Sequence, residues 1–169
     1  PFYLYLAPYA PHAPWHAPAE SVRTVEQKFK QLCRHDNKEY PCQLSTFYIY
    51  YAAMMMHVDR GLAELITALE RKNLAKNTQI ILTADNGGYH FQQAFHQLRG
   101  QKSELYEGGI RVPLIFWNWQ ATGERVSPVS LMDIFPTIAS VIGHAPTGLD
   151  GLDISQVIGG KEQRERSLY

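Results

Sequence analysis

Residues 79–88, with the sequence QIILTADNGG, decide the fold. The apolar run 80–82 ends at Thr83 and turn residues follow at once, a pattern typical of a buried parallel strand that stops at a sheet edge. Asp85 and Asn86 therefore lie at the carboxyl end of a predicted strand. In open α/β sheets ligands bind at this end, because the loops that leave the strands converge there on a crevice.

Asp85 and Asn86 place a carboxylate beside an amide oxygen. Hard oxygen donors of this kind suit calcium or magnesium, and Gly87 and Gly88 let the backbone turn sharply away. The same residues also fit a simple tight turn, since Asn-Gly is a strong turn dipeptide. Taken by itself, the local sequence favours the simple turn over the metal site.

The size and charge of the chain argue against several classes of protein. Its 169 residues suit one domain with a real core, and Lys plus Arg equal Asp plus Glu at 16 each. Without an excess of positive charge, neither a nucleic acid nor an anionic membrane is an expected partner. No apolar run approaches the roughly 20 residues that span a bilayer, and no signal-peptide pattern opens the chain. Because the first residue is Pro1 rather than Met, we expect a piece of a longer protein or a processed product.

The two cysteines, Cys33 and Cys42, lie close together in a polar stretch. They either close a small disulfide loop in an oxidising compartment or are two unrelated thiols. A zinc site is less favoured, because no second Cys or His pair with ligand spacing lies around them.

Helical and strand-like patterns along the chain predict an α/β fold with a mostly parallel central sheet flanked by helices. Strands are indicated by uncharged apolar runs, and the longest helix by apolar residues that recur at steps of three and four. The predicted strands are 2–7, 80–82 and 112–117, and the predicted helices are 25–32, 44–72 and 130–142.

The segment 8–18 (PYAPHAPWHAP) carries four prolines that forbid a helix and keep the backbone extended. A stiff loop after a strand holds His12 in a fixed direction, which a catalytic or anion-binding imidazole needs. Two other interpretations stay open: a histidine merely tolerated at the surface, or a polyproline ligand for an SH3-like partner. The second is weaker, because the preceding strand ties the segment to a core.

Lys102 lies in a long polar loop, 89–109, and loops this long are commonly functional or disordered. Gly100 precedes it and the pair Gly108-Gly109 follows, so the backbone there is able to approach a ligand closely, and an ammonium group is a good point charge for an oxyanion. The alternative is an ordinary solvated lysine. His90 and its aromatic neighbours in the same loop either line a sugar-binding subsite or simply pack.

Five blocks of sequence connect these stretches: FYLYLAPYAPHAP (2–14), YAAMMMHVDRGLAELITAL (51–69), IILTADNGG (80–88), LRGQKSELYEGGIRVP (98–113) and SLMDIFPTIASVIGHAPTGLDGL (130–152). In this order and spacing they resemble the sulfatase family of the alkaline-phosphatase-like superfamily. The resemblance reverses the preference for a simple turn at Asp85 and Asn86. It implies that residues 1–169 are the middle-to-late portion of one sulfatase catalytic domain.

The resemblance also implies roles for individual residues. Asp85 and Asn86 match the second pair of ligands to a divalent cation, usually calcium. Lys102 matches the lysine that contacts sulfate and the metal side, and His12 the histidine that contacts sulfate or assists the leaving oxygen. To these substrate contacts we add His90, which rests on its place in the aromatic loop and not on the resemblance. The family hydrolyses sulfate esters of small molecules or glycans: a formylglycine hydrate, made from Cys or Ser, attacks sulfur, the alcohol departs, and sulfate is then eliminated.

The chain also departs from the family pattern. Neither the early Asp-Asp metal pair nor the Cys/Ser-x-Pro-x-Arg nucleophile motif is present, since Cys33 is followed by RHD and Cys42 by QLS. The chain alone is therefore expected to bind metal weakly, because calcium prefers 6 to 8 oxygens, and not to turn over substrate. Gln101 stands where the family commonly has a second glycine before the lysine.

Two alternative functions follow from the same residues. One is a phosphodiesterase or phosphonate hydrolase of the same superfamily, although Asn86 is commoner among sulfatases, whereas phosphoryl-transfer relatives commonly carry His there. The other is a non-catalytic remnant that binds sulfated glycans through His12 and Lys102. The resemblance implies a periplasmic, secreted or lysosomal location, and the sequence predicts no oligomeric state.

Overall fold

The computed structural model describes residues 1–35, 45–89, 98–119, 121–161 and 166. For residues 33–35 it describes the backbone only. The chain forms two compact units. One unit combines Pro1–Lys76 with Ala84–Pro113, and the other combines Asn77–Thr83 with Leu114–Tyr169. Each unit is described by itself below.

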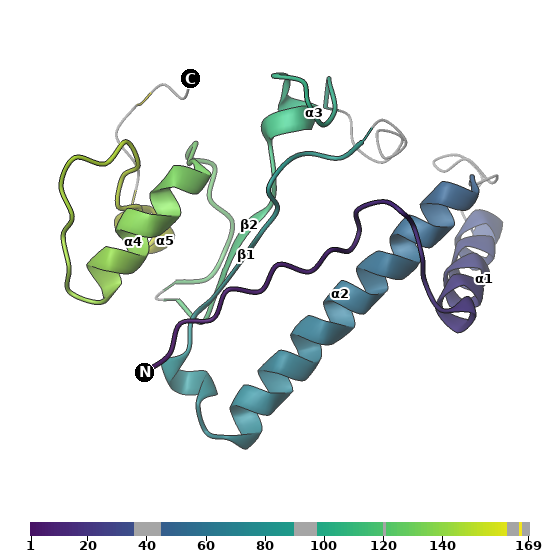
Figure 1. Cartoon of the computed structure of the whole chain (residues 1–169), viewed down its shortest axis with the longest axis horizontal. Helices are drawn as coiled ribbons and strands as arrows, with labels where there is room; N and C mark the ends of the chain where they lie inside the picture. The colour runs from purple at the N-terminus through teal and green to yellow at the C-terminus, as the bar shows by residue number, and fades with distance from the viewer. Residues whose placement is uncertain (36–44, 90–97, 120, 162–165, 167–169) are drawn as a thin grey trace. The chain divides into compact units, whose positions relative to one another are not determined.

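Two helices form the body of the first unit, α1 (Ala19–His35) and α2 (Thr46–Arg71), and they pack on each other (Figure 1). The long helix predicted at 44–72 is confirmed, whereas α1 extends well beyond the predicted 25–32. Its buried Val25 contributes to the core. A hydrogen bond of 2.9 Å between Ser21 Oγ and His57 Nε2 joins the two helices. Within the part of the chain that the structure describes, no helix is both long and apolar enough to cross a membrane.

The end of α2 explains why the helix stops where the sequence indicates. Asn73 has a φ of 56°, in the left-handed region that Asn tolerates better than most residues. Its N–H donates to the Glu70 carbonyl and the next N–H, of Leu74, donates to the Leu69 carbonyl. These two bonds form a Schellman motif, which satisfies the last carbonyls of the helix.

The described sheet has two strands and is antiparallel: β1 (Ile80–Thr83) pairs with β2 (Leu114–Trp117), with Ile80 opposite Trp117 (Figure 1). The positions of both strands agree with the sequence, but the expected mostly parallel sheet is not confirmed. Four-residue apolar runs do not encode the direction of pairing, which depends on how the connection between the strands returns. Both strands are largely half-buried rather than fully buried.

Residues 2–7 do not form the predicted central strand. Phe2, Tyr3, Leu4, Tyr5 and Leu6 are 56–78% exposed, and no described strand pairs with them. A strand requires backbone partners as well as an apolar sequence, and only the second requirement is met within the described residues.

The second unit packs short helices against the sheet. Its core consists of Ile154, Val157 and Ile158, and the partly buried Leu114, Phe116, Trp119 and Val129 pack on it. The helical elements here are η3 (Leu131–Asp133), α4 (Ile134–Val141) and α5 (Ser155–Ile158). The helix predicted at 130–142 is thus confirmed, with Gly143 following it at a φ of 79°.

Asp133 is the buried centre of this unit, with no exposed surface. Its carboxylate accepts hydrogen bonds from the Ser130 and Leu152 N–H groups, at 2.7 and 2.9 Å. Arg166 binds both oxygens in a bidentate pair, at 2.9 and 2.7 Å. Because a buried charge is tolerated only when it is paired and hydrogen-bonded, this set of contacts explains how a carboxylate lies in the interior.

Candidate active site

The candidate site is built on two loops of the first unit that are joined through their backbones, residues 85–88 and 99–111, here called the paired loops. Gly87 N–H donates to the Gly109 carbonyl at 2.9 Å, and Lys102 N–H donates to the Gly88 carbonyl at 2.8 Å. Within the second loop, Gly108 N–H donates to the Arg99 carbonyl at 2.7 Å. These bonds hold the loop after β1 against the loop that carries Lys102.

Three glycines allow close backbone contacts here, Gly87 between the paired loops, and Gly108 and Gly109 within the second loop. A Cβ atom at Gly87 would lie 2.0 Å from the Gly108 carbonyl oxygen, and one at Gly108 would lie 2.1 Å from the Gly100 carbonyl oxygen. A Cβ at Gly109 would lie 2.1 Å from the Glu104 carbonyl oxygen. Real side chains do not approach the backbone so closely, so these positions require glycine for lack of space.

Asp85 and Asn86 follow β1 directly, as predicted. Asp85 is exposed and Asn86 is half-buried, and the Asn86 Nδ2 group donates to the Gly87 carbonyl at 2.9 Å. Because this bond uses the nitrogen end of the amide, the oxygen end is turned away from the Gly87 carbonyl. One carboxylate and one amide oxygen fit a hard divalent cation such as calcium but supply only part of its 6 to 8 ligands. The described residues contain no cluster of three or more His, Cys, Asp or Glu side chains suited to a metal.

Lys102 occupies a corner of a tight turn, residues 101–104, in which Glu104 N–H donates to the Gln101 carbonyl at 2.9 Å. The next residue, Ser103, has a φ of 75°, and Lys102 itself is half-buried. Gln101 braces the same turn, because its Nε2 donates to Glu104 Oε1 at 3.3 Å. The backbone position of Lys102 is therefore set both by this turn and by its bond to Gly88.

His12 makes its contacts inside the proline-rich segment, between the cis peptide bonds Ala10–Pro11 and Ala13–Pro14. Its Nδ1 lies 2.8 Å from the Ala13 carbonyl oxygen and 3.1 Å from the Tyr9 hydroxyl, which itself donates to Ala13 O. A carbonyl only accepts, so Nδ1 carries a proton and the Nε2 of the neutral ring is the basic nitrogen. The imidazole is thus held in one tautomer.

Two exposed pairs flank Lys102 in the second loop. The Arg99 guanidinium carbon lies 3.8 Å from the centre of the Tyr106 ring, and Arg99 Nη2 donates to the Tyr106 hydroxyl at 2.7 Å. Glu107 and Arg111 form an ion pair of 3.4 Å with both side chains more than half exposed. Neither Arg99 nor Tyr106 was predicted as a site residue, and their only signal in the sequence is a position on each side of Lys102.

The structure thus brings together some of the predicted site residues. Asp85, Asn86 and Lys102 lie on the paired loops, whereas His12 lies on a separate segment of the same unit. His90 and Cys42 lie outside the described residues. Asp133 was not predicted as an important residue either. Its role at the start of a helix could have been predicted, because Ser130 and Asp133 have the spacing of a capping box, which the structure contains.

The family model for sulfatases matches residues 1–144. The chain belongs to the sulfatase family. Among curated sulfatases, it is 33% identical to steryl-sulfatase of Mus musculus over 134 residues, which cover 70% of this chain and 22% of that protein. It is 29% identical to a sulfatase of Formosa agariphila over 177 residues, covering 93% of this chain and 31% of that one.

Solved structures are similar as well. The crystal structure of Ps i-CgsB matches with a TM-score of 0.72 and 35% identity, over 92% of this chain and 33% of that chain. The same protein in complex with k-i-k-neocarrahexaose matches with a TM-score of 0.67 and 32% identity, over 88% of this chain and 31% of that one. The chain therefore spans about a fifth to a third of the length of these relatives.

We predict that Gly87→Ala separates the paired loops. Its new methyl group would overlap the Gly108 carbonyl, and overpacking of this kind costs about 1–3 kcal/mol. Urea denaturation should show the loss of stability, and limited trypsin digestion should show faster cleavage after Arg99 and Lys102. Gly61→Ala is the matched control, because a Cβ at this exposed helical glycine meets nothing within 4 Å. The control should gain up to about 1 kcal/mol, and equal effects of the two variants would contradict the prediction.

Proposed function

We propose that this chain supplies the metal-side and cationic part of the active site of a sulfuric ester hydrolase. Asp85 and Asn86 contribute two ligands to a divalent cation, Lys102 contacts the sulfate group, and His12 acts at the oxygen of the ester. The observation that carries the proposal is the Lys102 N–H bond to the Gly88 carbonyl. It ties the ammonium-bearing residue to the loop that carries both oxygen donors.

The paired loops suit the charge of a sulfate ester. A cation and an ammonium group held on one rigid framework stabilise negative charge on the transferring group without reorganising during the reaction. When bound, a calcium ion would neutralise part of this charge and help to orient the sulfate. Asp85 and Asn86 would hold it together with oxygen ligands from outside this pair.

His12 is suited to proton transfer at the oxygen that leaves sulfur. With its Nδ1 bound to the Ala13 carbonyl, the ring presents Nε2 to a ligand. A group whose tautomer and direction are fixed in advance avoids the cost of orienting it in the transition state. The protonated ring donates from Nε2 to the departing alkoxide, or to a sulfate oxygen.

The nucleophile is not among these residues. The 169 residues contain no Cys/Ser-x-Pro-x-Arg motif, so the formylglycine of the family, if this protein uses it, comes from outside them. Sulfate ester turnover is accordingly proposed for the protein that contains this chain together with such a group.

A sulfated glycan is the substrate class that we favour. The similar protein Ps i-CgsB has been crystallised with k-i-k-neocarrahexaose, an oligosaccharide, and matches 88% of this chain. His90 remains a predicted substrate contact, and a periplasmic, secreted or lysosomal location remains a prediction.

The first test compares 4-nitrophenyl sulfate with 4-nitrophenyl phosphate as substrates of the full-length protein. Sulfate should be hydrolysed faster, and Lys102→Ala should lower kcat by about 10²–10³-fold, the usual loss when one charge-stabilising contact is removed. Lys72→Ala, which removes an exposed lysine at the end of α2, is the control and should leave kcat unchanged. Turnover of phosphate alone would sink the proposal in favour of a phosphodiesterase. Tight binding of sulfated glycans without turnover would favour a non-catalytic role.

A second test addresses the metal ligands by calorimetric titration of the full-length protein with CaCl2. Replacing Asp85 by Asn removes a charged ligand, and ligand charge sets calcium affinity, so the Kd should rise at least about tenfold. The control is Asp59→Asn, which neutralises an exposed carboxylate on α2 and should leave the Kd unchanged. An unaltered Kd in Asp85→Asn would remove this residue from the proposed ligand set.

A third test addresses His12 through the leaving group. Protonation matters little when 4-nitrophenolate departs and matters greatly when an alkoxide departs. His12→Ala should therefore lower kcat/KM for a sulfated alcohol about 10²-fold more than for 4-nitrophenyl sulfate. His16→Ala, an exposed histidine of the same segment, is the control. Equal losses on both substrates would argue that His12 binds sulfate rather than supplying a proton.

A further inference from the structure

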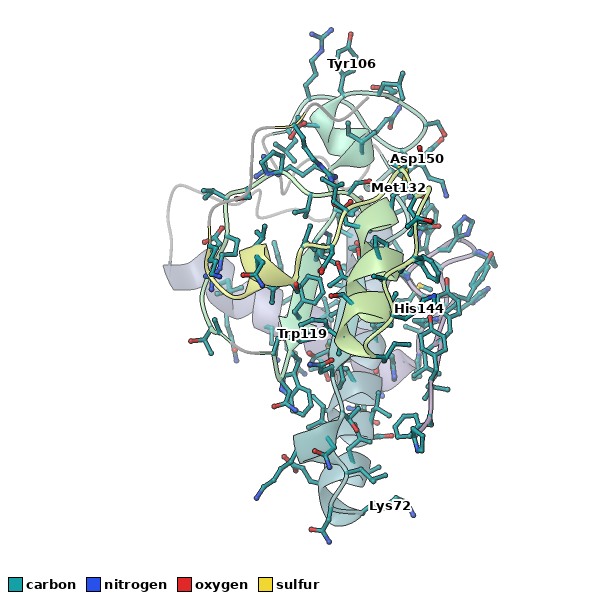
Figure 2. The ribbon with its side chains drawn as sticks, turned by 90° about the vertical axis from the view of Figure 1, so that its left-hand side faces the viewer. Lys72, Tyr106, Trp119, Met132, His144 and Asp150 are labelled. Atoms are coloured by element: carbon teal, nitrogen blue, oxygen red, sulfur yellow. The ribbon has the colours of Figure 1, made fainter. Side chains whose placement is uncertain are left out.

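Arg99 and Tyr106 form an exposed stacked pair next to the candidate site, here called the Arg-Tyr platform. The guanidinium covers one part of the Tyr106 ring at 3.8 Å and binds its hydroxyl at 2.7 Å. Both residues are exposed, Tyr106 by 46%. Figure 2 shows the Tyr106 side chain pointing outward from the loop beside α3 (Glu107–Ile110).

The backbone hydrogen bonds that hold the loop use neither the Arg99 guanidinium nor the Tyr106 hydroxyl. The loop is held by backbone groups: the Arg99 carbonyl accepts from Gly108, and the Tyr106 carbonyl accepts from Gly109 and Ile110. The Tyr106 Cβ packs over Gly100, where a new Cβ would lie 2.5 Å away, and every residue except glycine retains this atom. The aromatic ring and the guanidinium therefore project from a loop that is already held by other contacts.

The platform lies close enough to Lys102 for an extended ligand to contact both. Arg99 is three residues before Lys102 and Tyr106 is four after it, so their Cα atoms lie at most about 11 and 14 Å from that of Lys102. The turn 101–104 between them is closed by its own hydrogen bonds. A ligand longer than one sugar ring, held at Lys102, therefore has the platform as a neighbour.

We propose that the Arg-Tyr platform binds a second unit of a sulfated oligosaccharide while Lys102 contacts the sulfate that is cleaved. The guanidinium recognises a sulfate or carboxylate on that unit through its planar set of N–H donors. The Tyr106 ring offers an apolar face and a polar edge to the sugar, as sites that bind small polar molecules commonly do. This inference rests on the proposed function and adds a determinant of substrate specificity to it.

The carboxylates around the platform weaken a general attraction to long polyanions, so that recognition depends on an anionic group lying at the guanidinium itself. Glu104 and the ion-paired Glu107 lie in the same loop as Arg99 and Lys102, and the whole chain has no net charge. A polyanion would meet these carboxylates, whereas a single sulfate at the guanidinium need not. The platform therefore selects for where an anionic group is placed, not for total charge.

The test compares a long and a short substrate in the full-length protein. Arg99→Gln and Tyr106→Ala should raise KM for a sulfated carrageenan hexasaccharide, or for a chondroitin sulfate hexasaccharide, about tenfold with kcat nearly unchanged. Loss of binding that is equal in the ground and transition states gives this pattern. Both variants should hydrolyse 4-nitrophenyl sulfate as the unmodified protein does, because this ester does not reach the platform. Tyr106→Phe, which keeps the ring and loses the hydroxyl, should fall between Tyr106→Ala and the unmodified protein.

Arg60→Ala is the matched control, because it removes an exposed arginine on α2, and it should behave as the unmodified protein on every substrate. Equal losses on the hexasaccharide and on 4-nitrophenyl sulfate would overturn the inference, since the pair would then merely brace the Lys102 loop. An unchanged KM for both hexasaccharides would overturn it as well. If the unmodified protein does not hydrolyse 4-nitrophenyl sulfate, the proposed function fails. Calorimetric binding of the hexasaccharides to the same variants then tests the platform separately.

Discussion

The candidate site depends on the close contact between the backbones of the paired loops, residues 85–88 and 99–111, where glycine leaves room for the approach. Side chains contribute little to this contact, because the atoms that meet are carbonyl oxygens, N–H groups and the α-carbons of glycine. A framework of this kind is stiff, since hydrogen bonds at 2.7–2.9 Å leave little freedom and no side chain has to change rotamer. The chemical groups that it presents, one carboxylate, one amide and one ammonium, are therefore placed by the main chain.

In the second unit a charged side chain, rather than contact between backbones, holds the loops in place. Around Asp133 a single buried side chain collects donors from Ser130, Leu152 and Arg166. Here the Asp133 carboxylate fixes the positions of backbone N–H groups, whereas in the paired loops the backbone fixes the positions of the charged residues. The difference fits the exposure of the two regions, because donors around the buried Asp133 replace water, whereas the exposed Asp85 is open to solvent.

The sequence predicted the longer helices, which depend mainly on interactions between residues close together in the chain. Apolar periodicity located α2, and the left-handed Asn73 ends it within a residue or two of the prediction. The prediction failed where a distant partner is needed: residues 2–7 have the composition of a strand but no described pairing, and the direction of β1 against β2 was not encoded in four apolar residues. For the site, the glycines predicted a close approach of the backbone to a ligand, and the structure shows a close approach to other backbone atoms; the role of Lys102 stays a prediction. The Arg99–Tyr106 stack was not predicted, since no periodicity relates two residues seven apart in an irregular loop.

Arg166 has a consequence for how this region is divided experimentally. It lies 33 residues from Asp133 and supplies the only described charged partner of that carboxylate. The family match ends at residue 144, so a boundary chosen from sequence similarity would cut the chain before this arginine and leave an unpaired negative charge in the interior. Expression boundaries, domain swaps and chimaeras with other sulfatases should therefore treat residues 130–166 as one exchangeable piece.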